Sequence, residues 1–120
     1  MFLGLRTVIY RVSDLAAAKA WYARAFGIQP YFDEPFYVGF EVGGYELGLH
    51  PHEGELTIGN NEIAYWGVAD IDAAHRQMLE RGATPHEAVQ DVGGGIKIAA
   101  VNDPFGNVVG LIENPNFRAR

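Results

Sequence analysis

Two stretches of the chain place apolar residues at three- and four-residue spacing, and the second stretch repeats the first. Each follows an aspartate, Asp14 or Asp70, whose carboxylate can accept from the free N–H groups of a first helical turn. Gly27 and Gly82 come where a helix needs a left-handed C-terminal residue. The pattern therefore predicts two amphipathic helices, one between Asp14 and Gly27 and the other over Ile71–Arg81.

Around these helices the sequence alternates or is continuously apolar and rich in β-branched and aromatic residues, which predicts strands. Gly43-Gly44 and the segment Asp103–Asn107 have the composition of tight turns between them. The predicted strands are Leu5–Val12, Gln29–Asp33, Phe36–Val42 and Tyr45–His50 in the first half, and Glu62–Val68, Thr84–Asp91, Ile96–Val101 and Val108–Glu113 in the second.

Each half of the chain is thus a predicted βαβββ module. The internal repeats cover about residues 1–52 and 60–114, and the polar segment Pro51–Asn61 connects them. We expect one α+β domain over residues 1–120, with eight strands and two helices.

Composition narrows the class of partner. Nine Lys and Arg residues against fifteen Asp and Glu residues give a net charge of −6, which disfavours binding to the phosphates of nucleic acid. The chain has no cysteine, so thiolate chemistry and disulfides are excluded. The sequence shows neither a leader-like amino terminus nor a run of transmembrane length. We therefore expect a cytoplasmic protein without nucleic-acid or membrane partners.

The paired modules carry more specific motifs. Each helix opens with V-x-D followed by Leu or Ile, and the last strand is preceded by a turn in the run D-P-F-G-N-V-V-G-L-I-E. In these features the whole chain resembles the vicinal oxygen chelate superfamily, which includes glyoxalase I, bleomycin resistance proteins, fosfomycin resistance enzymes and extradiol dioxygenases. The resemblance implies that each module curls into a half-barrel, that two modules enclose a cleft, and that the protein is a homodimer.

The same resemblance implies positions for metal ligands, and this chain fills them with other residues. The ligand positions on the first strand of each half fall on Thr7 and Ile63, and the carboxylate position of the last strand falls on Gly110. In the first half the carboxylate position falls on Gly48, although Glu46 shares its face. One carboxylate cannot hold a divalent ion, so we expect no metal and no cofactor, as in the bleomycin-binding branch.

Glu46 is the first candidate for a functional residue, since parity points it into the expected cleft. One interpretation is a carboxylate that contacts a ligand, or a catalytic base if burial raises its pKa. The alternative is a partly solvated strand carboxylate paired with Arg11.

Other candidates are weaker. His50, His52 and Glu53 form the one cluster with metal-like composition, but Pro51 makes an edge or loop there, and a solvated loop is the favoured interpretation. Tyr65 shares the face of the cleft, and one or two of three neighbouring aromatic residues are expected to wall it: Phe36, Tyr37 and Phe40. The predicted ligand-binding residues are these four aromatic residues together with Thr7, Arg11, Glu46 and His50.

Several aromatic, histidine and glycine residues are interpreted as structural rather than functional. Trp21, Tyr22 and Phe26 are expected in the core, and His75 and His86 receive no role. The three glycines 93–95 are interpreted as a hairpin loop, because a strand follows them where a phosphate loop needs a helix.

The leading hypothesis is a metal-independent protein of the glyoxalase/bleomycin-resistance type that binds or sequesters a small organic molecule, an antibiotic or metabolite that is aromatic or cationic. The alternative is a glyoxalase-like lyase or isomerase, or a dioxygenase, with a non-standard site that uses Glu46 as base. A structural or regulatory protein with an empty cleft is the third possibility.

Overall fold

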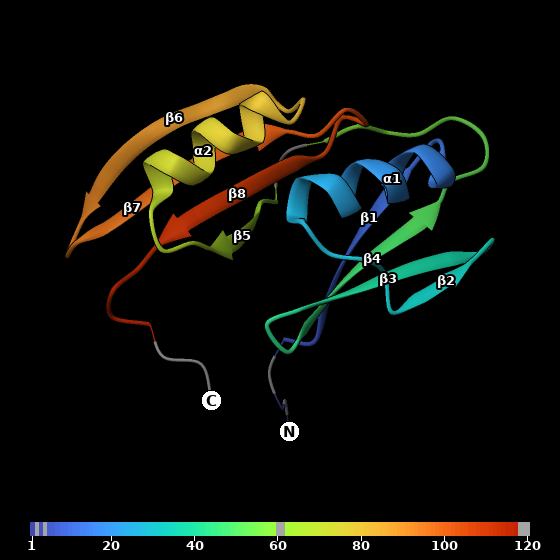
Figure 1. Ribbon diagram of the computed structural model, residues 1–120, viewed down its shortest axis with the longest axis horizontal. Helices are drawn as coiled ribbons and strands as arrows, with labels where there is room; N and C mark the ends of the chain where they lie inside the picture. The colour runs from blue at the N-terminus through green and yellow to red at the C-terminus, as the bar shows by residue number, and fades with distance from the viewer. Residues whose placement is uncertain (2, 4, 60–61, 118–120) are drawn as a thin grey trace. The chain divides into compact units, whose positions relative to one another are not determined.

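The structure is a computed structural model that describes residues 1, 3, 5–59 and 62–117 of the chain. Figure 1 shows the order of its elements along the chain. The first half contains β1 (Thr7–Val12), α1 (Leu15–Phe26), β2 (Phe32–Glu34), β3 (Tyr37–Val42) and β4 (Tyr45–Pro51). The second half contains β5 (Ala64–Gly67), α2 (Ile71–Glu80), β6 (Thr84–Gly93), β7 (Ile96–Asn102) and β8 (Val108–Glu113).

The chain forms two compact units, which divide between Thr57 and Ile58. The described residues of each unit build a βαβββ module with one four-stranded sheet, in the order β1-β4-β3-β2 in the first and β5-β8-β7-β6 in the second. The division falls inside the predicted connection Pro51–Asn61. The predicted α+β architecture of two βαβββ modules, eight strands and two helices is therefore confirmed.

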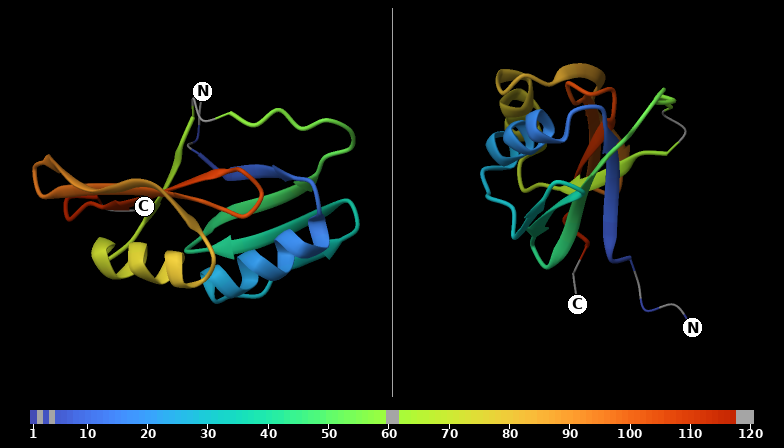
Figure 2. Two further views of the ribbon diagram at one scale, coloured as in Figure 1. Left: turned by 90° about the horizontal axis from the view of Figure 1, so that it is seen from above. Right: turned by 90° about the vertical axis from the view of Figure 1, so that its right-hand side faces the viewer.

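In the first unit, α1 covers one face of the sheet (Figure 2). Strand register sets which side chains face this helix, because alternate residues of a strand point to opposite sides. Tyr10 pairs with Leu49, and Leu49 pairs with Val38, so all three point to one side. The ring of Tyr10 lies 6.0 Å from that of Tyr22 on α1, which identifies this side as the helix side. The buried apolar side chains of this core are Tyr10, Val12, Ala18, Trp21, Tyr22, Ala25, Val38, Phe40, Leu47 and Leu49.

In the second unit, a core cluster of Ile71, Ala99 and Leu111 joins α2 to β7 and β8. The turn before β8 is held by Asp103, which is buried. Its carboxylate accepts from the backbone N–H groups of Phe105 and Asn107 at 2.8 Å and from the side-chain amide of Asn107 at 2.8 Å. The D-P-F-G-N motif is therefore a rigid turn that positions β8.

Both predicted helix caps are present. The Asp14 carboxylate accepts from the N–H of Ala17 at 3.0 Å, and that of Asp70 accepts from the N–H of Ala73 at 3.1 Å. Gly27 ends α1 with a φ of 70°, a conformation in which other residues are strained. These local signals explain why the helix bounds agree with those predicted.

Strand bounds differ more from the prediction. The predicted strand Gln29–Asp33 is β2, Phe32–Glu34, because Pro30 has no N–H to donate and pairing with β3 begins after it. β1 begins at Thr7 rather than Leu5, since β4 begins at Tyr45 and offers Thr7 its first register partner, Glu46. No helix in the described part of the chain is long and apolar enough to cross a membrane.

Candidate functional site

The candidate site lies on the face of the first sheet opposite α1, which we call the open face. Thr7, Ile9 and Arg11 of β1 lie in register with Glu46, Gly48 and His50 of β4. β3 lies on the other side of β4, and its residue Gly39 pairs with Gly48. Gly39 therefore also faces the open face. The sequence-predicted residues Thr7, Arg11, Glu46 and His50 are therefore on one surface.

A carboxylate surrounded by hydroxyl groups occupies this face. Glu46 Oε1 accepts from Thr7 Oγ1 at 2.7 Å and from the phenol of Tyr37 at 2.8 Å. Glu46 Oε2 accepts from the phenol of Tyr31, which lies in the segment that leads into β2. We call Thr7, Tyr31, Tyr37 and Glu46 the hydroxyl cluster.

Two glycines make room for the tyrosines. Tyr37 lies next to Val38, the partner of Leu49, and its side chain crosses Gly48 to reach Glu46. A Cβ built on Gly48 would clash with the Tyr37 hydroxyl. The Tyr31 ring lies over Gly39 in the same manner, with a ring carbon 3.0 Å from the Cβ position. Any larger residue at these two positions would move a tyrosine away from Glu46.

The cluster holds Glu46 in its ionised form. The hydrogen bonds from Tyr31 and Thr7 lower the pKa of Glu46, against a smaller opposing effect of burial, and the bond from Tyr37 acts in the same direction. Burial acts to raise this pKa, but hydrogen bonding outweighs desolvation at this half-exposed position, so the net direction is downward. A role of Glu46 as catalytic base stays a prediction.

The pKa values of the two tyrosines shift upward, opposite to that of Glu46. Burial and the hydrogen bond to Glu46 raise the pKa of Tyr37 to about 12, although the neighbouring Thr7 hydroxyl acts against this rise. The hydrogen bond to Glu46 raises the pKa of Tyr31 as well. Both phenols therefore remain protonated at any physiological pH.

An alkaline titration should detect this cluster. Followed by phenolate absorbance, Tyr37 should ionise near pH 12, above the ordinary value of 10.0. Since the raised pKa belongs to the folded state, the stability that it contributes is present below pH 10 and is lost as the pH rises toward 12. Glu46→Gln removes the charge and should return the late transition toward 10; a Tyr37→Phe variant that keeps this transition would show that it belongs to another residue.

Aromatic side chains extend the open face beyond the hydroxyl cluster. The Phe32 ring lies 6.1 Å from that of Tyr37 and 5.9 Å from that of Phe36. Phe36 is 63% exposed and Tyr31 is 62% exposed. Apolar rings that remain accessible beside a carboxylate are typical of a surface that binds a ligand.

The predicted histidine cluster does not assemble into a metal site. His50 Nδ1 lies 3.4 Å from the Arg11 guanidinium and 2.9 Å from the carbonyl oxygen of Pro51, whereas His52 Nε2 contacts the carbonyl of Glu55 at 2.9 Å. Within residues 5–59 and 62–117, no three His, Cys, Asp or Glu side chains are grouped so that they could hold an ion.

The ligand positions implied by the resemblance also fail to fit a metal on steric grounds. A Cβ on Gly110 would lie 2.6 Å from the Tyr65 ring and 2.8 Å from the Ala64 carbonyl oxygen. A carboxylate cannot be accommodated at this position, and hydroxyl groups already surround Glu46. The described residues therefore do not form the metal centre of the metal-dependent members.

One predicted site residue lies elsewhere. Phe40 was one of three aromatic residues of which one or two were expected to wall the pocket, but it is fully buried in the core on the side of α1. It pairs with Leu47, so it points away from the open face, and the prediction for Phe40 is wrong. Tyr65 belongs to the second unit, where it pairs with Gly110 and is 42% exposed; its role in binding stays a prediction.

The sequence-based reasoning missed Tyr31, which comes before β2. The available signal was the pair of glycines on neighbouring strands, Gly39 and Gly48, which leaves space above the sheet for large side chains. Phe32 was missed in the same way, because its place beside Tyr37 depends on where β2 begins.

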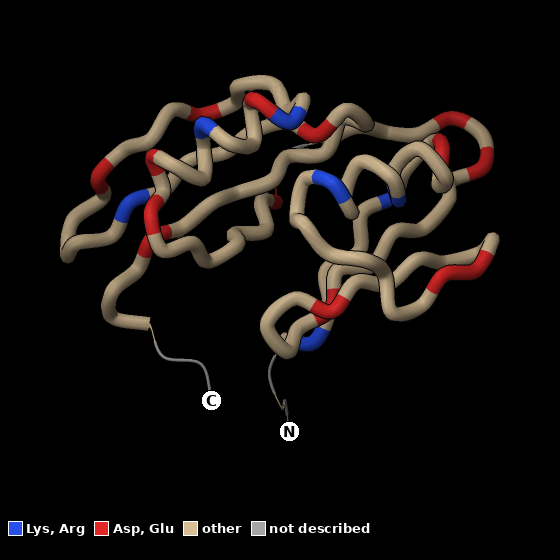
Figure 3. The backbone as a smooth tube through the Cα atoms, in the orientation of Figure 1, with Lys and Arg blue, Asp and Glu red and all other residues tan. Residues whose placement is uncertain are grey.

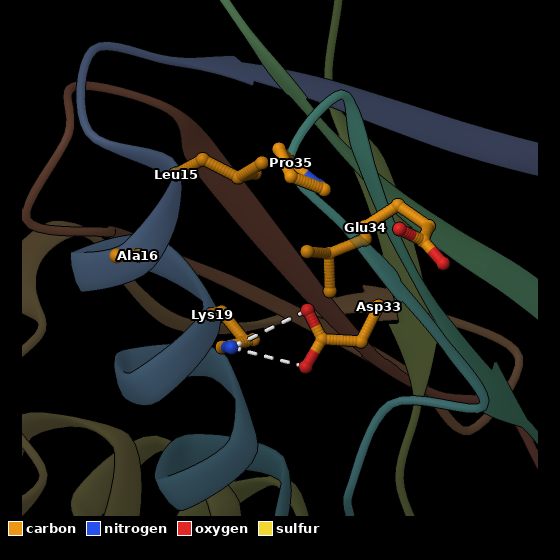
Figure 4. Close-up of a pocket in the computed structure, with 7 residues that line it drawn as sticks. Leu15, Ala16, Lys19, Asp33, Glu34 and Pro35 are labelled. Carbon is orange, nitrogen blue, oxygen red and sulfur yellow. Dashed lines mark hydrogen bonds and ion pairs between the residues drawn. The ribbon is translucent and has the colours of Figure 1, made fainter.

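A separate hollow of about 180 Å³ lies between α1 and β2 (Figure 4). Lys19 and Asp33 form an ion pair of 3.0 Å across it, and Leu15 and Val38 supply apolar walls. Sites for drug-sized ligands are usually about 300–1,000 Å³, so this hollow is small, and it is on the helix side of the sheet. We therefore place the candidate site on the open face.

The acidic residues, drawn red in Figure 3, are distributed along both units.

Comparison with known proteins agrees with the fold. The model of the glyoxalase/bleomycin resistance protein/dioxygenase superfamily matches residues 4–111. No curated protein matches significantly.

Solved structures with the same fold include proteins named as enzymes and a protein named as a resistance determinant. A glyoxalase-related enzyme from Fulvimarina pelagi has a TM-score of 0.80 at 16% identity, with 99% of this chain and 94% of that chain covered. A lactoylglutathione lyase from Agrobacterium tumefaciens scores 0.77 at 21% identity, with coverages of 98% and 100%. A bleomycin resistance determinant encoded on transposon Tn5 scores 0.75 at 22% identity, with coverages of 93% and 98%.

Proposed function

The chain belongs to the glyoxalase/bleomycin resistance protein/dioxygenase superfamily, and within it we propose a metal-independent protein that binds a small organic molecule and leaves it chemically unchanged. The ligand, an antibiotic or metabolite, occupies the open face of the first sheet. The protein acts as a cytoplasmic homodimer, as the resemblance implies.

The hydroxyl cluster is the observation that carries this proposal. Three hydroxyl groups of the described residues converge on Glu46, and they come from β1, from the segment before β2 and from β3. Such a cluster fixes the positions of Tyr31 and Tyr37, whose rings then offer a rigid surface beside Phe32. A rigid aromatic surface beside a carboxylate favours binding, because few side chains must become ordered when a ligand binds.

The same electrostatics support binding over proton transfer. A catalytic base works best when its pKa lies near the operating pH, whereas hydrogen bonds lower the pKa of Glu46 below 4.5. Tyr37, with a pKa of about 12, lies well above the operating pH. A lyase or isomerase that uses Glu46 as base is therefore the less favoured candidate.

A thermal-shift screen in the presence of a chelator tests the proposal. A library of antibiotics and aromatic metabolites should contain molecules that raise the melting temperature without any metal, since a ligand that binds only the folded state stabilises it. The stabilisation should disappear in Glu46→Ala and persist in Glu80→Ala, which removes a carboxylate from the exposed end of α2.

Mass spectrometry of the recovered ligand separates binding from turnover. The ligand should return with its mass unchanged after prolonged incubation. A chemically altered ligand, a stabilisation that the chelator abolishes, or a hit that is indifferent to Glu46→Ala would each overturn the proposal. Sedimentation velocity tests the homodimer, and a monomer at micromolar concentration would contradict that part.

A further inference from the structure

We propose that the open face selects organic cations that carry N–H groups, such as primary ammonium or amidinium compounds with an aromatic substituent. This inference rests on the proposed function and deepens it, because it names the chemical class of the ligand. It follows from where the hydroxyl protons of the cluster point.

Each hydroxyl group has one proton to donate and lone pairs that accept. Glu46 is ionised and has no proton, so in each contact with Thr7, Tyr31 or Tyr37 the hydroxyl group is the donor. The protons of the cluster are therefore directed inward, toward the carboxylate. Toward a ligand, the oxygen atoms of the cluster present lone pairs only.

A surface that offers acceptors alone is selective. An ammonium or amidinium group supplies donors that match these lone pairs and a positive charge that matches Glu46. A carboxylate or phosphate group would face lone pairs and a like charge, and its own lone pairs would stay unpaired there. A quaternary ammonium would meet the charge but has no N–H to give.

The acceptor atoms are within reach of a ligand. Tyr31 is 62% exposed, Thr7 is exposed, and Glu46 is half-buried. The rings of Tyr31 and Tyr37 lie over Gly39 and Gly48, so a cation beside their hydroxyl groups also approaches aromatic carbon. Cation–π attraction adds to the hydrogen bonds at such a place.

Other charges on the open face agree with a cationic ligand near Glu46. Glu41 pairs with Glu46 across the strands, and Glu34 pairs with Tyr37, so both carboxylates lie on the same side of the sheet. Arg11 forms a register pair with His50 four residues farther along β1 and β4. That separation is about 13 Å, beyond the reach of one small functional group. Arg6, which precedes Thr7, instead donates from its guanidinium to the carbonyl oxygen of Leu3 at 3.4 Å.

A set of matched probes tests the inference by isothermal titration calorimetry at neutral pH. The probes are 2-phenylethylammonium, its N,N,N-trimethyl analogue and 3-phenylpropanoate, which share a phenyl group and differ in charge and N–H donors. The primary ammonium should bind about tenfold more tightly than the trimethyl analogue, because charge-assisted hydrogen bonds are lost in the latter, and the carboxylate should bind least.

Two variants locate the effect. Tyr31→Phe keeps the ring and removes one acceptor oxygen, so it should weaken the ammonium probe about tenfold and leave the trimethyl probe unchanged. Glu46→Gln introduces amide donors, which free hydroxyl protons to turn outward, and should remove the preference for the ammonium. Glu80→Gln, which loses the same charge on the exposed end of α2, should bind all probes as the parent does.

The outcomes separate this inference from the proposed function. Equal affinity for the ammonium and trimethyl probes, or tightest binding of 3-phenylpropanoate, would overturn the inference while binding on the open face stands. Failure of every probe to bind at millimolar concentration would also overturn it, and the library screen then decides the proposed function by itself.

Discussion

Replacing Phe40 by alanine should lower the free energy of unfolding of the first unit by about 3–5 kcal/mol. Phe40 is fully buried on the helix side of the sheet, beside Val38 and Leu47, so truncation removes its apolar contacts and leaves a cavity. Urea unfolding monitored by circular dichroism measures the change.

Phe36 is the matched control for this variant. It is also an aromatic residue near β3, but it is 63% exposed, so Phe36→Ala should change the stability by less than about 1 kcal/mol. A Phe40→Ala protein as stable as Phe36→Ala would show that Phe40 is outside the core and would restore it to the predicted pocket wall.

Replacing Gly110 by alanine should destabilise the second unit by about 1–3 kcal/mol, although it adds only one methyl group. The added Cβ would lie 2.8 Å from the carbonyl oxygen of Ala64, 2.8 Å from a methyl group of Ile63 and 2.6 Å from the Tyr65 ring. The carbonyl oxygen belongs to β5, which pairs with β8, so the contact cannot be relieved by a side-chain rotation alone. Thermal unfolding of the variant measures the loss.

Gly67 offers a matched control in the same pair of strands. A Cβ on Gly67 meets no atom within 4 Å, so Gly67→Ala should be neutral or stabilising by up to about 1 kcal/mol. Equal melting temperatures for the two variants would contradict the steric closure of Gly110. They would also reopen that position to the carboxylate that metal-dependent members carry there.

The sequence predicted the parts of the fold that depend on local signals. Asp14 and Asp70 cap the helices, and Gly27 ends the first, because each acts on the backbone within four residues of itself. The repeat of the module then implied two similar sheets. Strand ends were less predictable, since the first pair of a ladder depends on where the partner strand begins, as with Thr7 and Glu46.

The candidate site was predicted only in part, for a related reason. The ligand positions implied by the resemblance, with the parity that relates Glu46 to Gly48, brought Thr7 and Glu46 together, but the face of Phe40 required the register between β3 and β4. Tyr31 was missed because it reaches Glu46 from outside any strand, over Gly39. The pKa of Glu46 could not be predicted without those hydroxyl partners, which reverse the direction that burial alone would give.

The position of a bound ligand tests the central claim most directly. Intermolecular nuclear Overhauser effects between 2-phenylethylammonium and the protein should connect the probe to the ring protons of Tyr31 and Tyr37 on the open face. Contacts to Leu15 and Val38, which line the small hollow beside α1, would instead place the ligand on the helix side of the sheet and contradict the account.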